Sequence, residues 1–131
     1  MTFGLWLMKK FRFRQFQIYK DALQFQKELK NLSREKFPRE EQFCLTSQLW
    51  RALDSIILNI AEGADRGTDK DFAHFLNISH TSLNEVVACL DLAVSNSYIP
   101  ENENNIFLIR AENLANQITA FRRKLLKEPT K

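Results

Sequence analysis

Four segments of this chain repeat apolar residues in alternating steps of three and four, and this spacing constrains the fold more than any other feature. A helix turns by about 100° per residue, so such steps place the apolar side chains on one helical face. The repeating positions are Ile18, Ala22, Phe25, Leu29 and Leu32 in the first segment and Leu45, Leu49, Ala52, Ile56 and Ile60 in the second. They are Phe72, Leu76, Leu83, Val86, Leu90 and Val94 in the third, where Ser79 has the same spacing, and Phe107, Ala111, Leu114, Ile118, Phe121 and Leu125 in the fourth. Four helices with one apolar face each predict a bundle around a shared core.

The connections between these segments are short and contain residues that end or begin helices. Pro38 follows the first segment, Gly63 and Gly67 flank the turn after the second, and Pro100 separates the third from the fourth. Thr68 stands where the N-cap of the third helix is expected. Short connections make successive helices antiparallel neighbours. The sequence therefore predicts an all-α fold, an antiparallel up-down-up-down four-helix bundle.

The first eight residues stand apart from this pattern. Residues 2–8 are mostly apolar, but the segment is short and its positive charges follow it, whereas a secretory signal has the opposite order. No stretch of the sequence is long and apolar enough to span a membrane. We therefore expect residues 1–8 to be a disordered extension of a single domain over residues 9–131, and we expect no membrane partner.

Cys44 and Cys89 form no motif, which favours buried free thiols and a cytoplasmic location.

Charge is distributed unevenly along the chain, although the net charge is only +3. Residues 1–39 carry ten Lys and Arg against three Asp and Glu, residues 40–103 carry three against eleven, and residues 104–131 carry six against two. The predicted topology places the first helix beside the fourth, so the two basic ends of the chain become one side of the bundle. The candidate nucleic-acid contacts on this side are Lys9, Lys10, Arg12, Arg14, Lys20, Lys27, Lys30, Arg34, Arg110, Arg122, Arg123, Lys124 and Lys127.

Aromatic residues are interleaved with the basic residues near the N-terminus. They are Phe11, Phe13, Phe16 and Tyr19. Such rings can stack on unpaired bases, while the basic residues contact phosphates in a way that is largely independent of sequence and steeply sensitive to salt. Their spacing fits core positions as well, so the sequence leaves both roles open.

The second helical segment carries a polar stripe beside its apolar face. Its members fall within about 80° of one another around the helix; they are Gln48, Arg51, Ser55, Asn59, Glu62 and Arg66. In one interpretation, Arg51 and Arg66 hold an anion in a cleft. In the other, the stripe is a hydrogen-bond network that sets helix register or subunit contacts, with Glu62 pairing with Arg51 or Arg66. The second interpretation, a structural role, is favoured.

No motif in the sequence indicates an enzyme. His74 and His80 are separated by about 240° around a helix, so they cannot share a face as metal ligands at positions i and i+4 do. No cluster of Cys or carboxylates completes a metal site, and no Ser has a His at a spacing typical of a triad. None of the three glycines belongs to a phosphate-binding loop. We expect no catalytic residue, no metal and no cofactor.

One run of the sequence resembles a known family. The run is Phe37-Pro38-x-x-Glu41-x-Phe43-x-Leu45-x-x-Gln48-Leu49-x-Arg51-Ala52-x-x-Ser55-Ile56-x-x-Asn59-Ile60-Ala61-Glu62-Gly63. It resembles the bacterial four-helix-bundle proteins of the 23S rRNA intervening-sequence family, which also carries the label "S23 ribosomal protein". The positions that resemble the third-helix pattern of that family are Arg66, Phe72, Phe75, Leu76, Ser82 and Glu85. The similarity extends over nearly the whole chain from about Lys9 onward.

The resemblance implies an up-down four-helix bundle that forms ring-shaped homo-oligomers, with a pentamer as the expected state. The family is similar to the accessory variability determinants of diversity-generating retroelements, which are basic pentameric barrels that bind nucleic acid and a reverse transcriptase. We therefore expect a non-enzymatic protein that binds RNA or DNA non-specifically through a basic face of the first and fourth helices. The alternative is a protein–protein scaffold, or an accessory subunit that docks a partner enzyme such as a reverse transcriptase, with a purely structural polar stripe.

Overall fold

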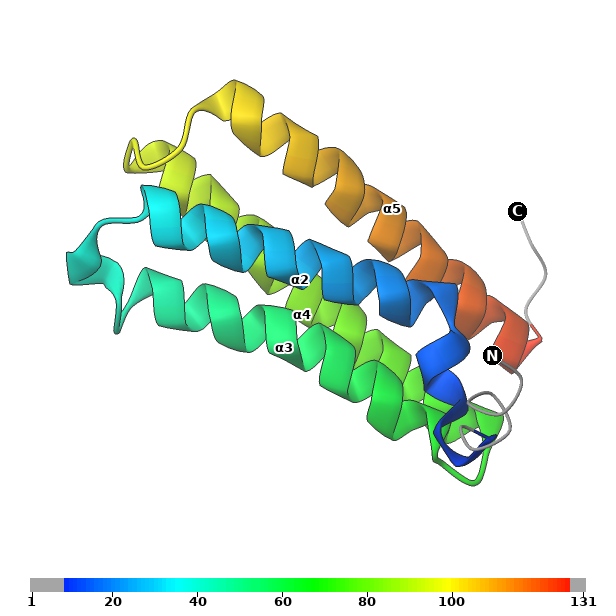
Figure 1. The fold of residues 1–131 in the computed structure, drawn as a ribbon. Coiled ribbons are helices and arrows are strands. Elements are labelled where there is room, and N and C mark those ends of the chain that lie inside the picture. Colours follow the sequence, from blue (N-terminus) through cyan, green and yellow to red (C-terminus); the bar gives the residue numbers. More distant parts are fainter. Residues whose placement is uncertain (1–8, 128–131) are drawn as a thin grey trace.

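The computed structural model describes residues 9–127, and these form a succession of helices (Figure 1). Its elements in chain order are the 3₁₀ segment η1 (Lys9–Gln15), α2 (Gln17–Lys36), the 3₁₀ segment η2 (Arg39–Glu41), α3 (Leu45–Ala64), α4 (Asp69–Ser95) and α5 (Glu101–Leu126). No strand occurs within the described residues. The prediction of an all-α helical bundle is confirmed. The extension expected at residues 1–8 lies outside the described part of the chain.

Successive helices run in opposite directions along the bundle (Figure 1). Trp50, near the start of α3, donates a hydrogen bond from Nε1 to Ser33 Oγ near the end of α2, at 2.9 Å. Ser79 of α4 donates its hydroxyl proton to the carbonyl oxygen of Ile56 in α3, also at 2.9 Å. Because its hydroxyl has this partner, Ser79 can be buried among the apolar side chains of α4. α5 then returns beside α4 and also packs against α2.

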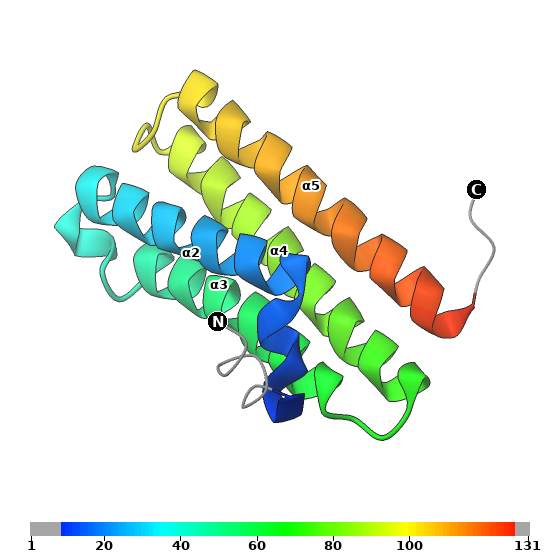
Figure 2. The same ribbon diagram turned by 45° about the vertical axis from the view of Figure 1, so that its right-hand side comes forward.

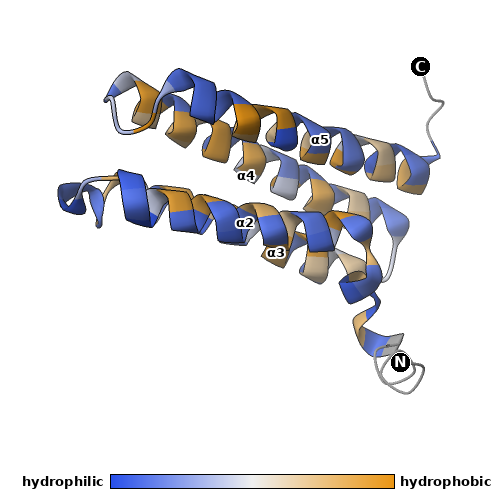
Figure 3. Ribbon diagram, turned by 45° about the horizontal axis from the view of Figure 1, so that its top comes forward, coloured by the Kyte–Doolittle hydropathy of each residue, from blue (hydrophilic) through white to orange (hydrophobic). Residues whose placement is uncertain are grey.

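The apolar faces that the spacing predicts meet in the interior of the bundle, while hydrophilic residues follow the outside of each helix (Figure 3). The large side chains with almost no exposed surface come from all four long helices; they include Phe25, Leu29, Leu49, Ile56, Ile60, Leu76, Leu83, Leu90 and Ile118. The prediction is less complete for the fourth segment, where Phe107, Phe121 and Leu125 are only half-buried. The physical reason is that α2 meets α5 partly through polar side chains rather than through a continuous apolar seam.

The turn between α3 and α4 depends on a glycine and a threonine. Gly63 lies inside α3, where an added Cβ would stand 2.7 Å from Phe75 Cβ and 2.9 Å from Phe72 Cδ1. The missing side chain therefore lets α4 approach α3 closely. Thr68 Oγ1 accepts a hydrogen bond from the backbone N–H of Asp71 at 3.1 Å, which confirms the predicted N-cap. The end of α3 and the start of α4 are thus fixed side by side.

Candidate nucleic-acid interface

Four basic side chains gather on the solvent-facing side of α2, and we call this surface the α2 face. Lys20, Lys27, Lys30 and Arg34 line a shallow, open depression of about 430 Å³. Their spacings of seven, three and four residues return to the same side of a helix. The other side chains that line the depression are uncharged. The α2 face therefore concentrates positive charge without a carboxylate in its lining.

Trp50 of α3 holds two of these cations in place. Lys30 Nζ lies 5.0 Å, and Arg34 Cζ 4.8 Å, from the centre of a Trp50 ring. Lys30 Nζ also lies 2.8 Å from Asp54 Oδ1, so Asp54 partly neutralises its charge. The cation–π contacts and the indole bond to Ser33 restrict the motion of both side chains. The contact of Trp50 with these cations was not predicted from the sequence. The one indication in the sequence was that Lys30 and Arg34 lie one helical turn apart, so that a single side chain can contact both.

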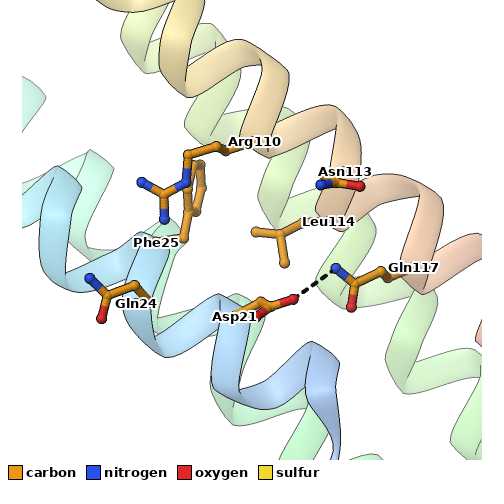
Figure 4. A pocket seen from close by; sticks show the side chains of 7 residues that line it. All are labelled: Asp21, Gln24, Phe25, Arg110, Asn113, Leu114 and Gln117. Carbon is orange, nitrogen blue, oxygen red and sulfur yellow. Dashed lines mark hydrogen bonds between the residues drawn. The ribbon is translucent and has the colours of Figure 1, made fainter.

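The seam between α2 and α5 uses Arg110, another of the predicted basic contacts (Figure 4). Arg110 Nη1 lies 2.8 Å from Glu28 Oε1, and Gln117 donates a hydrogen bond to Asp21 Oδ2 at 3.0 Å. A pocket of about 230 Å³ lies between these pairs. Hydrogen bonds from Arg110 and then from Gln24 lower the pKa of Glu28, against a smaller opposing effect of burial. Arg110 is therefore committed to the carboxylate of Glu28.

η1 lies against the end of α3 (Figure 2), and Arg12 fixes this contact. Its Nη2 donates a hydrogen bond to the carbonyl oxygen of Ala64, the last residue of α3, at 3.0 Å. The guanidinium carbon lies 5.5 Å from the ring centre of Phe16 and 5.7 Å from that of Phe72. A cation at this position also complements the negative end of the helix dipole. Arg12 acts as a structural contact between η1 and the bundle.

The remaining predicted basic residues lie at this same end of the bundle, on η1 and the last turns of α5. Lys9 begins η1; the others are Lys10, Arg14, Arg122, Arg123, Lys124 and Lys127. Arg122 Nε donates a hydrogen bond to the carbonyl oxygen of Ala73 at 3.2 Å, so it faces α4. The thirteen candidates thus lie at the α2 face, at the α2–α5 seam and at the bundle end. Successive residues turn by about 100° around a helix, which spreads the basic residues of α5 around its axis.

The polar stripe of α3 contains a small hydrogen-bond network toward α4. Ser55 Oγ and Ser82 Oγ share a hydrogen bond of 2.8 Å between the two helices. Asn59 Nδ2 donates to the carbonyl oxygen of Ser55 at 2.8 Å and to its hydroxyl at 3.0 Å. These half-buried groups satisfy one another, which supports the structural interpretation for this part of the stripe.

The ends of the stripe are exposed and do not form an anion cleft. Arg66 Nη2 lies 2.8 Å from Glu62 Oε1, so Arg66 is the partner of Glu62. Gln48 and Arg51 are exposed, and neither side chain makes a hydrogen bond or ion pair within residues 9–127. Arg66 lies beyond the end of α3 at Ala64 and pairs with Glu62, which is about 16 Å from Arg51 along the helix axis at about 1.5 Å per residue. The two arginines are therefore too far apart to hold one small anion together, which argues against the first interpretation.

Other candidate groups are isolated. Residues 9–127 contain no cluster of three or more His, Cys, Asp or Glu that could hold a metal ion. No helix in this range is both long and apolar enough to cross a membrane. Cys44 and Cys89 are free, but only Cys89 is buried, because Cys44 precedes α3 at the surface. Burial, and to a smaller extent the charge of Glu85, raises the pKa of Cys89 to about 11.

Comparison with known proteins places this fold and sequence in a family. A family model described as "23S rRNA-intervening sequence protein" matches residues 14–120. A crystal structure of a protein with unknown function from the S23 ribosomal protein family of Bacteroides thetaiotaomicron is similar with a TM-score of 0.73. That likeness has 22% sequence identity and covers 81% of this chain and 98% of the other, so it shows the fold alone. The comparison with curated proteins gave no match. Because the family model covers most of the chain, this protein belongs to the 23S rRNA-intervening sequence protein family.

Proposed function

We propose that this protein binds nucleic acid, RNA or DNA, without base preference, through the α2 face. The observation that carries the proposal is the lining of that face, which holds Lys20, Lys27, Lys30 and Arg34 and no carboxylate. The printed name of the family, which refers to an intervening sequence of 23S rRNA, is consistent with it. The proposal assigns no catalytic step and no cofactor to the protein.

The dimensions of the α2 face suit a nucleic-acid backbone. Lys20 and Arg34 are about 21 Å apart along the helix axis, which corresponds to about six base pairs of duplex. Arg34 and Lys30 are positioned by Trp50, so less side-chain freedom is lost when they contact phosphates. Phosphate contacts of this kind give affinity and orientation, whereas base contacts give specificity. The α2 face therefore supports binding that depends on charge.

Charge reversal on the α2 face tests the proposal. The variant Lys20→Glu/Lys27→Glu places two carboxylates in the depression, while the control Arg51→Glu/Lys70→Glu makes the same change in net charge on α3 and α4. Binding of a 23S rRNA fragment and of an unrelated RNA of equal length would be measured by fluorescence anisotropy at low salt. All four substituted side chains are exposed, so circular dichroism should show unchanged helix content.

The α2 variant should weaken binding to both RNAs at least tenfold, because two favourable phosphate contacts become unfavourable. The control should weaken it several times less. Equal losses in the two variants would mean that only net charge matters and that the α2 face is not the interface. An absence of RNA and DNA binding by the unsubstituted protein at low salt would rule out the function itself.

A second candidate function is a homo-oligomeric scaffold, and exposed apolar residues on α5 favour it. Ile106 is 59% exposed and Ile109 is 69% exposed, one helical turn apart on the same side of α5. Adjacent apolar side chains at this exposure are typical of an interface. We propose a second copy of the chain as the occupant, in a ring for which a pentamer is the expected size. A partner enzyme such as a reverse transcriptase would then dock on the ring.

The variant Ile106→Glu/Ile109→Glu tests this scaffold. Light scattering should give a multiple of the 15.4 kDa chain mass for the unsubstituted protein and a smaller particle for the variant. The control Leu58→Glu introduces a charge at an exposed apolar position of α3 and should leave the mass unchanged. A monomer in all three samples would contradict the scaffold.

We also propose that the protein acts in the cytoplasm. The exposed free thiol of Cys44 supports this location, since exposed thiols persist in a reducing compartment. Cell fractionation of the source organism should recover the chain with cytoplasmic markers.

A further inference from the structure

A pocket lies between η1 and the last turns of α3. These two segments lie side by side at one end of the bundle (Figure 2). Its volume is about 730 Å³, and it is open to solvent on one side. Its apolar lining comes from Phe11 and Phe13 of η1 and from Leu58, Ala61 and Ala64 of α3, and its other lining residues are charged. The mixture of an aromatic ring, an aliphatic side chain and charges suits a flat, polar-edged molecule better than a purely apolar one.

The four interleaved aromatic residues differ in how far their rings are exposed to solvent. Phe13 packs edge-on against Tyr19, with ring centres 5.0 Å apart. Phe16 contacts Phe72 at 6.2 Å and Phe121 at 5.4 Å, so it belongs to the core. Phe11 is 54% exposed, and its only ring contact in the described residues is an edge contact with Phe13 at 6.5 Å. Phe11 therefore offers a ring surface to solvent at the pocket.

The backbone that carries Phe11 is held in place. Arg12, the next residue, is bonded to the end of α3. The backbone N–H of Phe16 donates to the carbonyl of Phe13 at 3.0 Å, which closes the end of η1. Phe11 itself interrupts the 3₁₀ segment with φ −117° and ψ 51°. An anchored ring loses little conformational freedom when a ligand stacks on it.

The charged residues that line the pocket leave one net positive charge beside this ring. They are Lys10, Arg12 and Arg66 against Glu62 and Asp65. Arg66 Nη2 pairs with Glu62 Oε1 at 2.8 Å, yet the Arg66 side chain stays 41% exposed, and its guanidinium carbon lies 4.4 Å from the ring centre of Phe75, which positions it. Lys10 is exposed beside Phe11 and Asp65 is exposed at the end of α3. A phosphate group can therefore lie against Lys10 or Arg66 while a base lies on the ring of Phe11.

We propose that this pocket binds an unpaired nucleobase of a single-stranded nucleic acid, with Phe11 as the stacking surface and Lys10 and Arg66 as phosphate contacts. The inference rests on the proposed function and makes it more specific. The α2 face contacts the sugar-phosphate backbone of single-stranded or double-stranded nucleic acid, and the pocket favours unpaired strands. A base inside a duplex is stacked on both sides, so only the two terminal pairs of a duplex have a face free for Phe11, whereas every base of a single strand has one.

The test compares a short oligothymidylate with a blunt duplex of equal length. The variant Phe11→Ala should bind the single strand about tenfold more weakly than the unsubstituted protein. Its affinity for the duplex should be unchanged. The control Phe43→Ala removes an aromatic residue that is 86% exposed before α3, and it should change neither affinity. The variant Phe11→Trp should restore single-strand binding.

The Phe11→Trp variant also reports contact directly. Its added indole fluorescence, after subtraction of the signal from the unsubstituted protein, should be quenched by the oligothymidylate and not by the duplex. Equal single-strand affinity of Phe11→Ala and the unsubstituted protein would overturn the inference, as would an absence of quenching. Equal weakening of both ligands by Phe11→Ala would overturn it as well, since stacking on a base predicts a difference.

The experiments distinguish a failure of the pocket inference from a failure of the proposed function. If Lys20→Glu/Lys27→Glu binds duplex as well as the control does, the α2 face is not the interface, yet the quenching of Phe11→Trp still reports on the pocket. If the α2 variant loses duplex binding and Phe11→Ala has no effect on the single strand, the proposed function stands and the pocket inference fails.

Discussion

At the end of the bundle where η2 precedes α3, the side chains of Glu41 and Tyr98 join the connections between helices. Glu41 Oε2 accepts a hydrogen bond from the hydroxyl of Tyr98 at 2.6 Å, and Glu41 Oε1 accepts one from the backbone N–H of Leu45 at 3.3 Å. One carboxylate therefore links the start of α3 to the connection between α4 and α5. Tyr98 also packs against Phe37, with ring centres 5.8 Å apart. The bond to Glu41, and then partial burial, raises the pKa of Tyr98 to about 12.

The raised pKa of Tyr98 predicts a loss of stability at high pH. The neutral phenol is the form that donates to Glu41, and its pKa in the unfolded chain is near 10. Its contribution to the free energy of unfolding is therefore fully present below pH 10 and is lost as pH rises from 10 to about 12. Urea denaturation followed by circular dichroism should show a steeper decline for the unsubstituted protein than for Tyr98→Phe. Parallel declines would contradict this assignment.

At the scale of the elements, α3 and α4 form the tightest pair of the bundle. They are joined by the bond between Ser79 and Ile56, by the shared bond of Ser55 and Ser82, and by the close approach at Gly63. α2 and α5, by contrast, meet through ion pairs around a pocket. This difference explains why the apolar positions of α5 are less buried than the spacing predicts.

The substitution Gly63→Ala should weaken the contact of α3 with α4. Its Cβ would stand 2.7 Å from Phe75 Cβ, an atom that cannot move without its backbone. The overpacking costs about 1–3 kcal/mol, and the better helix propensity of Ala offsets about 0.5–1 kcal/mol of it. The free energy of unfolding from urea denaturation should therefore fall. Gly67→Ala, where no atom lies within 4 Å of the new Cβ, is the matched control and should change stability little. Equal stability of the two variants would contradict the close approach.

At the scale of the whole molecule, the fold groups charges that are far apart in the sequence and separates others that are close. Lys30 of α2 reaches Asp54 of α3, and Arg110 of α5 reaches Glu28 of α2. These pairs neutralise part of the basic charge, that of Lys30 on the α2 face included. The other basic residues of the candidate set lie on the α2 face and at the bundle end, so the binding strength should follow those local groups and not the net charge of +3.

The salt dependence of duplex binding should report the number of phosphate contacts. On the α2 face, Lys30 is paired with Asp54, whereas Lys20, Lys27 and Arg34 are in no ion pair within residues 9–127, so the face predicts a slope of log affinity against log salt of about −3 per chain. Replacing Lys20 and Lys27 by Ala should make the slope shallower by about 2, because each lysine accounts for about one contact. The measurement is a salt series of anisotropy titrations. An unchanged slope in the Lys20→Ala/Lys27→Ala variant would mean that other residues neutralise the phosphates.

The sequence alone predicted the helices, the bundle, the N-cap at Thr68 and most of the core. These features depend on spacings of three and four residues, on short connections and on single residues such as Gly63, so they are local properties that the order of residues fixes. It also predicted that Glu62 would pair with a nearby arginine, and one of the two partners considered, Arg66, lies one helical turn away.

Only the tertiary structure decided which basic and aromatic residues are available for binding. Arg12 meets Ala64, 52 positions away in the chain, and Gln117 meets Asp21, 96 positions away. Trp50 fixes two cations of a different helix, and Phe11 is the most exposed of the interleaved rings. Such contacts depend on how the helices are rotated and how closely they approach. A periodic pattern specifies which face of a helix is buried, but it does not specify which side chain of a neighbouring helix will meet it.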